Sequence, residues 1–141
     1  MAVELFGLVD CQKYIGPEPR MPSLELELTE PVSGGKKRFI APIDTGFAGY
    51  LLVPKLMYTD LATMELPQED FGSYSTMAGP IILRRATVEI KIGKDRRLSS
   101  FIETPMHGEG KLLAGRRIIS QLKLALLGDR MMCCQLKPVQ T

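Results

Sequence analysis

The sequence predicts an all-β protein folded as a single domain, and two stretches of the chain carry most of this prediction. Leucine and glutamate alternate from Ser23 to Thr29, as in a strand with one buried and one exposed face. Residues 81–92 are rich in β-branched side chains, which favour strands. With 141 residues, the chain is long enough to bury one core without metal ions or disulfides.

The other strands are predicted from apolar runs that end at turn residues. Such runs are interrupted at residues 16–19, at the "PVSGGKK" turn and at Ala78-Gly79-Pro80, and we expect a hairpin around each of the last two. The predicted strands cover residues 3–9, 23–29, 38–43 and 51–53, two arms on either side of 78–80, residues 98–104, and two closing strands joined at Gly128-Asp129.

Two short helical segments are expected between these strands. Pro54 is a favourable first helical residue, and it predicts a helical turn that extends to about Met64. Ile118, Ile119 and Leu122 have the spacing of one helix face near the C-terminus.

Composition and charge exclude several classes of partner. Lys and Arg number 18 against 16 Asp and Glu, and a net charge of +2 is too small to predict binding to nucleic acid or to a membrane. No apolar run is long enough to cross a bilayer, and the acidic N-terminal residues do not resemble a signal peptide. Cys11, Cys133 and Cys134 form an odd set without a C-x-x-C motif, which favours a reducing compartment and predicts a cytoplasmic protein.

A carboxylate inside an apolar run is the main chemical signal of this sequence. Asp44 lies within "FIAPIDTGFAGYLLVP", residues 39–54. Burying a carboxylate without partners costs several kcal/mol. Asp44 is therefore either a turn residue at the end of a strand or a group that takes part in chemistry. Gly46 follows where the chain must bend, and an apolar strand resumes at Leu51.

Three features along residues 22–136 together resemble the retropepsin-like aspartic proteases, the single-domain branch that includes the retroviral proteases. The strand that ends in Pro42-Ile43-Asp44-Thr45-Gly46 is similar to the family's hydrophobic-hydrophobic-Asp-[Ser/Thr]-Gly motif. The hairpin around Ala78-Gly79 is similar to the flap that closes over substrate. Leu113-Ala114-Gly115-Arg116 resembles the second signature, a hydrophobic-hydrophobic-Gly run before the C-terminal helix.

This resemblance implies a retropepsin-like acid protease fold, a closed or partly open β-barrel with a flap hairpin and one short C-terminal helix. It assigns residues 22–141 to the protease domain and residues 1–21 to an N-terminal extension or strand. The implied catalytic residues are Asp44, Thr45 and Gly46, and the implied structural signature is Leu113, Ala114, Gly115 and Arg116. The implied substrate-binding residues are Phe47, Ala48, Gly49, Met77, Ala78 and Gly79.

A single Asp-Thr-Gly motif is half of the chemistry that an aspartic endopeptidase needs. One group must deprotonate a water while another protonates the substrate carbonyl. Two adjacent carboxylates that share one proton can do both without a metal ion or cofactor. Because the chain has one such motif, Asp44 of a second copy must supply the other carboxylate. The sequence therefore predicts a homodimer that acts on peptide or protein substrates, with the Thr45 hydroxyl bonding across the dimer axis.

Two departures from the family pattern leave other functions open. Phe47 stands where retroviral members usually have Ala, and Ala48 stands where many have the acid that pairs with the residue equivalent to Arg116. The first alternative is a catalytically inert dimer that has the same fold and binds peptides. The second is a metal-dependent hydrolase that uses His107, the only histidine, although a zinc site needs two or three such ligands.

Overall fold

The computed structural model describes residues 5–15, 20–94, 96–128 and 130–139 and shows a chain that consists mostly of strands. The strands are β1 (Phe6–Lys13), β2 (Ser23–Thr29), β3 (Lys36–Pro42), β4 (Leu51–Leu52), β5 (Gly72–Thr76), β6 (Gly79–Ile92), β7 (Arg96–Pro105), β8 (Leu113–Ala114), β9 (Leu124–Leu127) and β10 (Met132–Pro138). The helices are α1 (Lys55–Leu61) and α2 (Arg116–Leu122), with a 3-10 turn, η1 (Gln68–Asp70). The predicted all-β class is confirmed.

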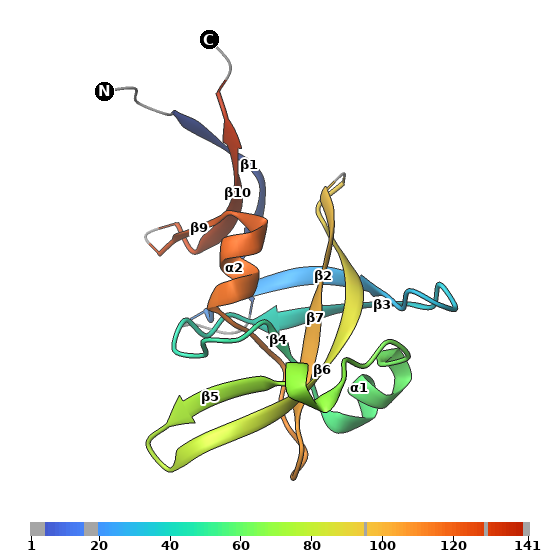
Figure 1. The fold of residues 1–141 in the computed structure, drawn as a ribbon. Helices are drawn as coiled ribbons and strands as arrows, with labels where there is room; N and C mark the ends of the chain where they lie inside the picture. The colour runs from blue at the N-terminus through green and yellow to red at the C-terminus, as the bar shows by residue number, and fades with distance from the viewer. Residues whose placement is uncertain (1–4, 16–19, 95, 129, 140–141) are drawn as a thin grey trace.

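The strands form a main sheet and a smaller terminal sheet (Figure 1). The main sheet has the order β3-β2-β6-β7-β4-β8, and β5 pairs with β6 beside this path. A parallel bridge between Ile43 and Ala114 joins the two ends of the path. The main sheet therefore closes on itself at one point, immediately before Asp44, as expected for a partly open barrel.

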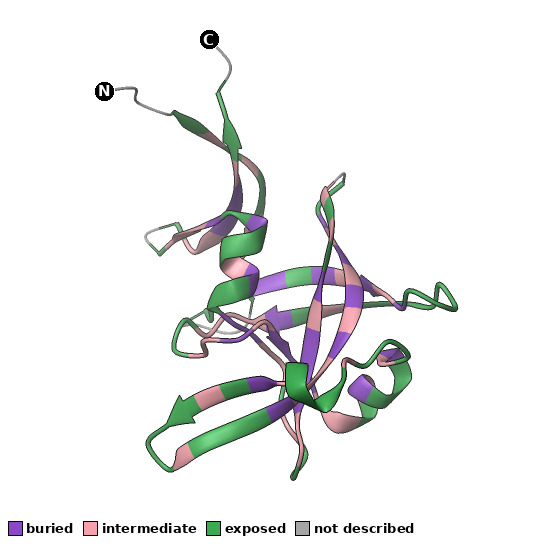
Figure 2. Ribbon diagram, viewed as in Figure 1, coloured by how far each residue is buried: buried purple, intermediate pink, exposed green. Residues whose placement is uncertain are grey.

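The core lies on the inner face of the main sheet, where the predicted alternation is confirmed. Leu24, Leu26 and Leu28 of β2 are at most 1% exposed, whereas Glu25 is exposed. Alternate residues of β6 from Ala86 to Ile92 are buried in the same way, and the centre of the sheet is the most buried region in Figure 2. Both helices also contribute apolar side chains to this core.

Helix α1 ends at Leu61, earlier than the limit near Met64 that Pro54 predicted. The residues after it have other partners. The Met64 carbonyl accepts a hydrogen bond from Thr87 N–H at 3.0 Å, and Glu65 forms a bridge with Ala86. Pairing with β6 therefore replaces further helical turns.

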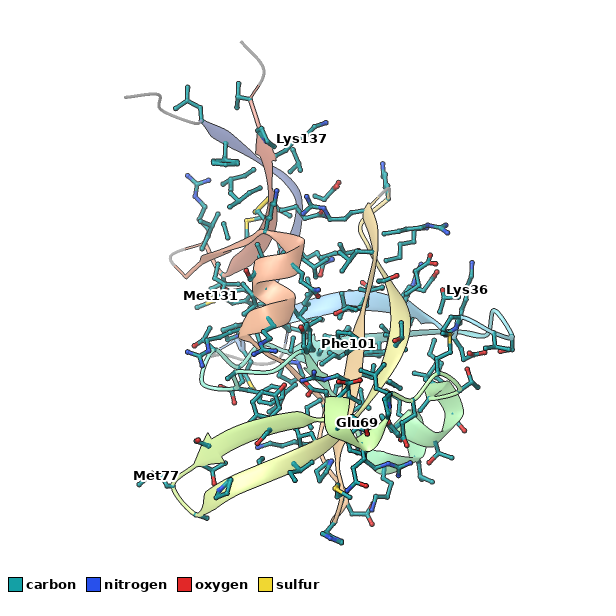
Figure 3. All side chains as sticks on the ribbon, viewed as in Figure 1. Lys36, Glu69, Met77, Phe101, Met131 and Lys137 are labelled. Carbon is teal, nitrogen blue, oxygen red and sulfur yellow. A yellow bond between two sulfur atoms is a disulfide. The ribbon has the colours of Figure 1, made fainter. Side chains whose placement is uncertain are left out.

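The β5–β6 hairpin projects from the body of the molecule (Figure 1). Thr76 pairs with Gly79, so the turn consists of Met77 and Ala78, whereas the sequence placed the tip at Ala78-Gly79-Pro80. Gly79 has a φ of 108°, a conformation that glycine adopts without steric cost. Met77 is fully exposed at the tip, as Figure 3 shows.

The terminal sheet has the order β1-β10-β9, so residues from both ends of the chain pair with each other. A disulfide joins Cys11 of β1 to Cys134 of β10, across 123 residues of sequence, while Cys133 is free and buried. The cysteine spacing did not indicate this pairing. Disulfides are typical of oxidising environments, so this one argues against the reducing compartment inferred from the sequence, and the cytoplasmic location stays a prediction.

Two other sequence expectations concern the same part of the chain. The predicted break at residues 16–19 and the first residues of the predicted 3–9 strand lie outside the described residues.

Among the residues that the structure does describe, no helix has the length and apolar character required to cross a membrane.

Candidate active site

Asp44 lies in a tight turn at the point where the main sheet closes. Its backbone N–H donates to the Ala114 carbonyl at 2.9 Å, and its carbonyl accepts from Phe47 N–H at 3.1 Å. Gly46 N–H donates to Asp44 Oδ1 at 2.8 Å, and a Cβ at Gly46 would lie 3.1 Å from that oxygen. In the described part of the chain no other hydrogen bond reaches this half-buried carboxylate. It retains capacity to bind a water or a second carboxyl group.

The Asp44 turn and the second signature form one packed unit. Gly115 N–H donates to the Tyr50 carbonyl at 2.7 Å, and Arg116 N–H donates to the Phe47 carbonyl at 2.9 Å. Helix α2 begins at this contact, with Gly115 as its N-cap residue. A Cβ on Gly115 would collide with the Gly49 carbonyl oxygen, so a side chain there would push the two segments apart. The structure thus brings together two motifs that are far apart in sequence.

The other residues assigned to the Asp44 motif differ in exposure. Thr45 and Gly46 are exposed, Phe47 and Ala48 are half-buried, and Gly49 is buried. A Cβ at Gly49 would lie 2.6 Å from Glu103 Oε1, so Gly49 packs closely against that side chain. The assignments of Thr45 to a contact across the dimer axis and of Phe47, Ala48 and Gly49 to the substrate site stay predictions.

Arg116 is held in place by the hydrogen bond from its backbone N–H to the Phe47 carbonyl. Its side chain is exposed, and among the described residues its guanidinium forms no ion pair. The next residue, Arg117, places its guanidinium 5.4 Å from the centre of the Tyr50 ring. This contact packs the start of α2 against the segment that follows Asp44.

The base of the β5–β6 hairpin meets the Asp44 turn, whereas its tip extends away from the body. The Tyr74 ring of β5 lies 5.6 Å from the Phe47 ring, measured between centroids. Met77 and Ala78 are exposed, and Gly79 is half-buried at the start of β6. The contact between these two rings therefore connects the hairpin to the candidate catalytic turn, and substrate binding by the tip stays a prediction.

Sequence reasoning missed Glu103 of β7, which is fully buried beneath this contact. Glu103 Oε1 accepts the Tyr50 N–H at 2.8 Å. Glu103 Oε2 accepts the Tyr74 hydroxyl at 2.7 Å and Arg85 Nη2 at 3.2 Å. Burial, reinforced by the hydrogen bond to Glu103, raises the pKa of Tyr74 to about 12, so its hydroxyl remains a donor at ordinary pH.

A weak signal for Glu103 is present in the sequence. It is the one charged residue in the predicted strand 98–104. Alternation places Ile102 inside and therefore Glu103 outside, and an outward glutamate needs no explanation. In the structure Ile102, Glu103 and Thr104 are all buried, because other segments cover both faces of β7 at this end.

An apolar groove of about 550 Å³ lies between the second hairpin strand and the end of β7. Its lining residues are Pro80, Ile81, Ile82, Leu83, Pro105, Met106 and His107. In the described ranges, no three His, Cys, Asp or Glu side chains gather as a group that could hold a metal ion. His107 is itself exposed.

Comparison with known proteins identifies the fold. No family model matches the sequence, and no curated protein matches it. Among solved structures, the chain is similar to EIAV protease in complex with the inhibitor HBY-793. The TM-score is 0.55 with 15% sequence identity, over 80% of this chain and 98% of that chain. The predicted retropepsin-like fold is confirmed, and a likeness at this level of identity concerns the fold alone.

Proposed function

We propose that this protein is a homodimeric aspartic endopeptidase whose site combines the Asp44 carboxylates of two copies. The observation that carries the proposal is the Asp44 turn, fixed to Ala114 and Gly46, in a retropepsin-like fold. The carboxylate is half-buried and, among the residues that the structure describes, accepts one hydrogen bond, from Gly46 N–H. This geometry leaves acceptor capacity for the water and the second carboxyl group that the proposal requires.

In the proposed reaction, a water lies between the two Asp44 carboxyl groups, of which one is ionised and one protonated. The ionised group takes a proton from the water as its oxygen attacks the scissile carbonyl carbon. The protonated group gives its proton to the carbonyl oxygen, and a gem-diol forms. The newly protonated carboxyl group then gives its proton to the amide nitrogen, and the other carboxylate takes a proton from one gem-diol hydroxyl as the C–N bond breaks. A carboxylic acid and an amine leave, and the pair again has one ionised and one protonated group.

The proposed substrate is an extended peptide segment between the Asp44 turn and the β5–β6 hairpin. Extended peptides bind by adding a strand to an exposed sheet edge, and alternate side chains then enter pockets. The groove beside Ile81 and Met106 offers an apolar surface for one such side chain. We therefore expect preference for peptides with apolar residues near the cleaved bond.

The first test replaces Asp44 with Asn, which keeps the size of the side chain and removes the shared proton. Hydrolysis of an extended peptide library should fall by at least about 10³-fold, while the fold and dimer persist. Wild-type activity should be unaffected by a chelator. Circular dichroism and sedimentation of the Asp44→Asn variant serve as controls for folding and assembly.

The outcomes separate this proposal from its alternatives. Cleavage by Asp44→Asn at the wild-type rate would place the site elsewhere. A wild-type protein that binds peptides tightly but never cleaves them would favour the inert peptide-binding dimer. Loss of activity with chelator would favour a metal-dependent hydrolase with His107 as a ligand.

A further inference from the structure

A cluster of three side chains around one fully buried carboxylate connects the hairpin to the body of the protein. Its members are Glu103 of β7, Arg85 of β6 and Tyr74 of β5, and we refer to them as the Glu103 cluster. Arg85 Nη2 donates both to Glu103 Oε2 at 3.2 Å and to the Tyr74 hydroxyl at 3.0 Å. Each hairpin strand therefore contributes one member, and both members bind the same carboxylate.

The same carboxylate also binds the segment that follows Asp44. Glu103 Oε1 accepts the Tyr50 N–H, and the Arg85 guanidinium lies 5.2 Å from the centre of the Tyr50 ring and 5.4 Å from that of Phe101. The Arg85 side chain is only 14% exposed. Removing one member of a buried pair leaves the other charge uncompensated, so this connection is costly to break.

Two glycines provide the space that the Glu103 cluster occupies. A Cβ on Gly72, the first residue of β5, would collide with Glu103 Oε2 and lie 2.8 Å from Arg85 Nη2. A Cβ on Gly49 would lie 2.8 Å from the Tyr74 hydroxyl. Any other residue at either position would displace the cluster. Because the cluster is closely packed against both glycines, the hairpin base and the segment after Asp44 are fixed relative to each other.

We infer that Glu103 is a positioning residue that fixes the base of the β5–β6 hairpin relative to the Asp44 turn and leaves the tip free to move. This inference rests on the proposed function, because the hairpin is taken to cover a bound peptide. The tip residues Met77 and Ala78 are exposed, whereas Gly72 at the base is buried. Motion is therefore confined to the outer hairpin, and the peptide meets a catalytic turn whose distance from the hairpin base is constant.

A second Tyr, Glu and Arg group provides a matched control on the opposite side of β6. The Tyr58 hydroxyl of α1 donates to Glu65 Oε2 at 2.6 Å, and Arg84 Nη2 lies 2.8 Å from the same oxygen. Removing the Tyr58 hydroxyl therefore also breaks a hydrogen bond from a tyrosine to a carboxylate. Tyr58 is 1% exposed, so its hydroxyl is as enclosed a donor as that of Tyr74 or more so. This group involves neither β5 nor the Asp44 turn.

The test compares Tyr74→Phe with Tyr58→Phe in the full-length protein. Amide hydrogen exchange in β5 and at Tyr50 should become about tenfold faster in Tyr74→Phe, the factor expected from losing one hydrogen bond to a charged group. KM for an extended peptide should rise several-fold in this variant, with a smaller change in kcat. Tyr58→Phe should lower the melting temperature about as much as Tyr74→Phe does. It should leave both KM and the exchange at Tyr50 unchanged.

Two readouts keep the failure of this inference distinct from the failure of the proposed function. Exchange at β5 and Tyr50 that is equal in Tyr74→Phe and wild type, or equally accelerated in Tyr58→Phe, would overturn the positioning role. If wild type and Asp44→Asn hydrolyse peptides at the same rate, the proposed peptidase function is wrong. The exchange measurement would still decide the role of Glu103. Glu103→Gln is the direct variant, but it leaves Arg85 without its carboxylate, so Tyr74→Phe decides.

Discussion

Three carboxylates of this protein differ in their hydrogen-bond donors, and these donors indicate what each residue does. Asp44 is half-buried and receives one backbone N–H from Gly46. Glu103 is fully buried and accepts hydrogen bonds from the side chains of Tyr74 and Arg85. A carboxylate with spare acceptor capacity can take up a water and a proton, whereas a saturated one is fixed in place.

Glu30 is a third case, in which a carboxylate organises a turn. It accepts the N–H groups of Val32 and Ser33, at 2.7 and 2.5 Å, as well as the hydroxyls of Ser33 and Thr63. Hydrogen bonds from the hydroxyls of Ser33 and Thr63, followed by those from the backbone, lower the pKa of Glu30 to about 2. The ionised form is therefore the one that holds the β2–β3 turn against the residues after α1.

The lowered pKa of Glu30 predicts a pH dependence of stability. Its stabilising effect is complete above its ordinary pKa of 4.5 and is lost as the pH falls toward about 2. Glu30→Gln should lower the melting temperature by a few degrees near neutral pH and by little at about pH 2. Thermal unfolding of both proteins across this range is the measurement. Parallel curves, with an equal difference at every pH, would contradict the role of the ionised form.

At the scale of elements, the hairpin has a fixed base and an exposed end. Its base is packed around Gly72, while in the turn the Thr76 hydroxyl donates to the Gly79 carbonyl at 2.5 Å. Gly79 has a positive φ, and a Cβ there would meet no atom within 4 Å. The requirement for glycine at this position is therefore conformational and not a matter of space.

Replacing Gly79 with Val should change the shape of the tip at a cost of about 1–3 kcal/mol in backbone strain. Under the proposed function, peptide turnover should fall about tenfold or more, because a cost of this size is borne by the segment that covers the substrate. Gly34→Val is the matched control, since Gly34 also has a positive φ and open space around a Cβ but lies in the β2–β3 turn. Melting temperatures and peptide kinetics of both variants are the measurements. Equal turnover in the two variants would argue against a substrate role for the tip.

At the scale of the whole molecule, the closure of the main sheet determines where Asp44 lies. The Ile43 to Ala114 bridge brings the Asp-Thr-Gly turn to the start of α2, and β1 and β10, from the two ends of the chain, pair with each other. One chain contributes one such turn, so a pair of carboxylates requires two chains. Assembly is therefore a condition of the proposed chemistry and not an addition to it.

Dimerisation is the prediction that belongs to this scale. Sedimentation at micromolar concentration should give about twice the chain mass of 15.7 kDa, and Asp44→Asn should give the same value. Repeating the run with a reductant tests whether the Cys11–Cys134 disulfide affects assembly. A monomer under all of these conditions, even with a peptide-mimic inhibitor present, would exclude a shared site.

The sequence by itself was sufficient for features that depend on near neighbours along the chain. Alternation identified β2, turn residues identified the β2–β3 and β5–β6 hairpins, and the spacing of Ile118 and Leu122 identified α2. The Asp44 turn was predicted for the same reason, because a carboxylate followed by Gly46 in an apolar run is a local pattern. Local patterns follow from backbone geometry, which repeats over two residues in a strand and 3.6 in a helix.

Only the tertiary structure decided the features that depend on which segments meet. Glu103 has the alternation of an outward residue, and it is buried because the hairpin and the Asp44 segment cover it. Cys11 and Cys134 are paired because β1 and β10 lie side by side, although 123 residues separate them in sequence. The early end of α1 likewise results from pairing with β6. Burial and pairing are properties of contacts between distant segments, and no periodicity within one segment can specify them.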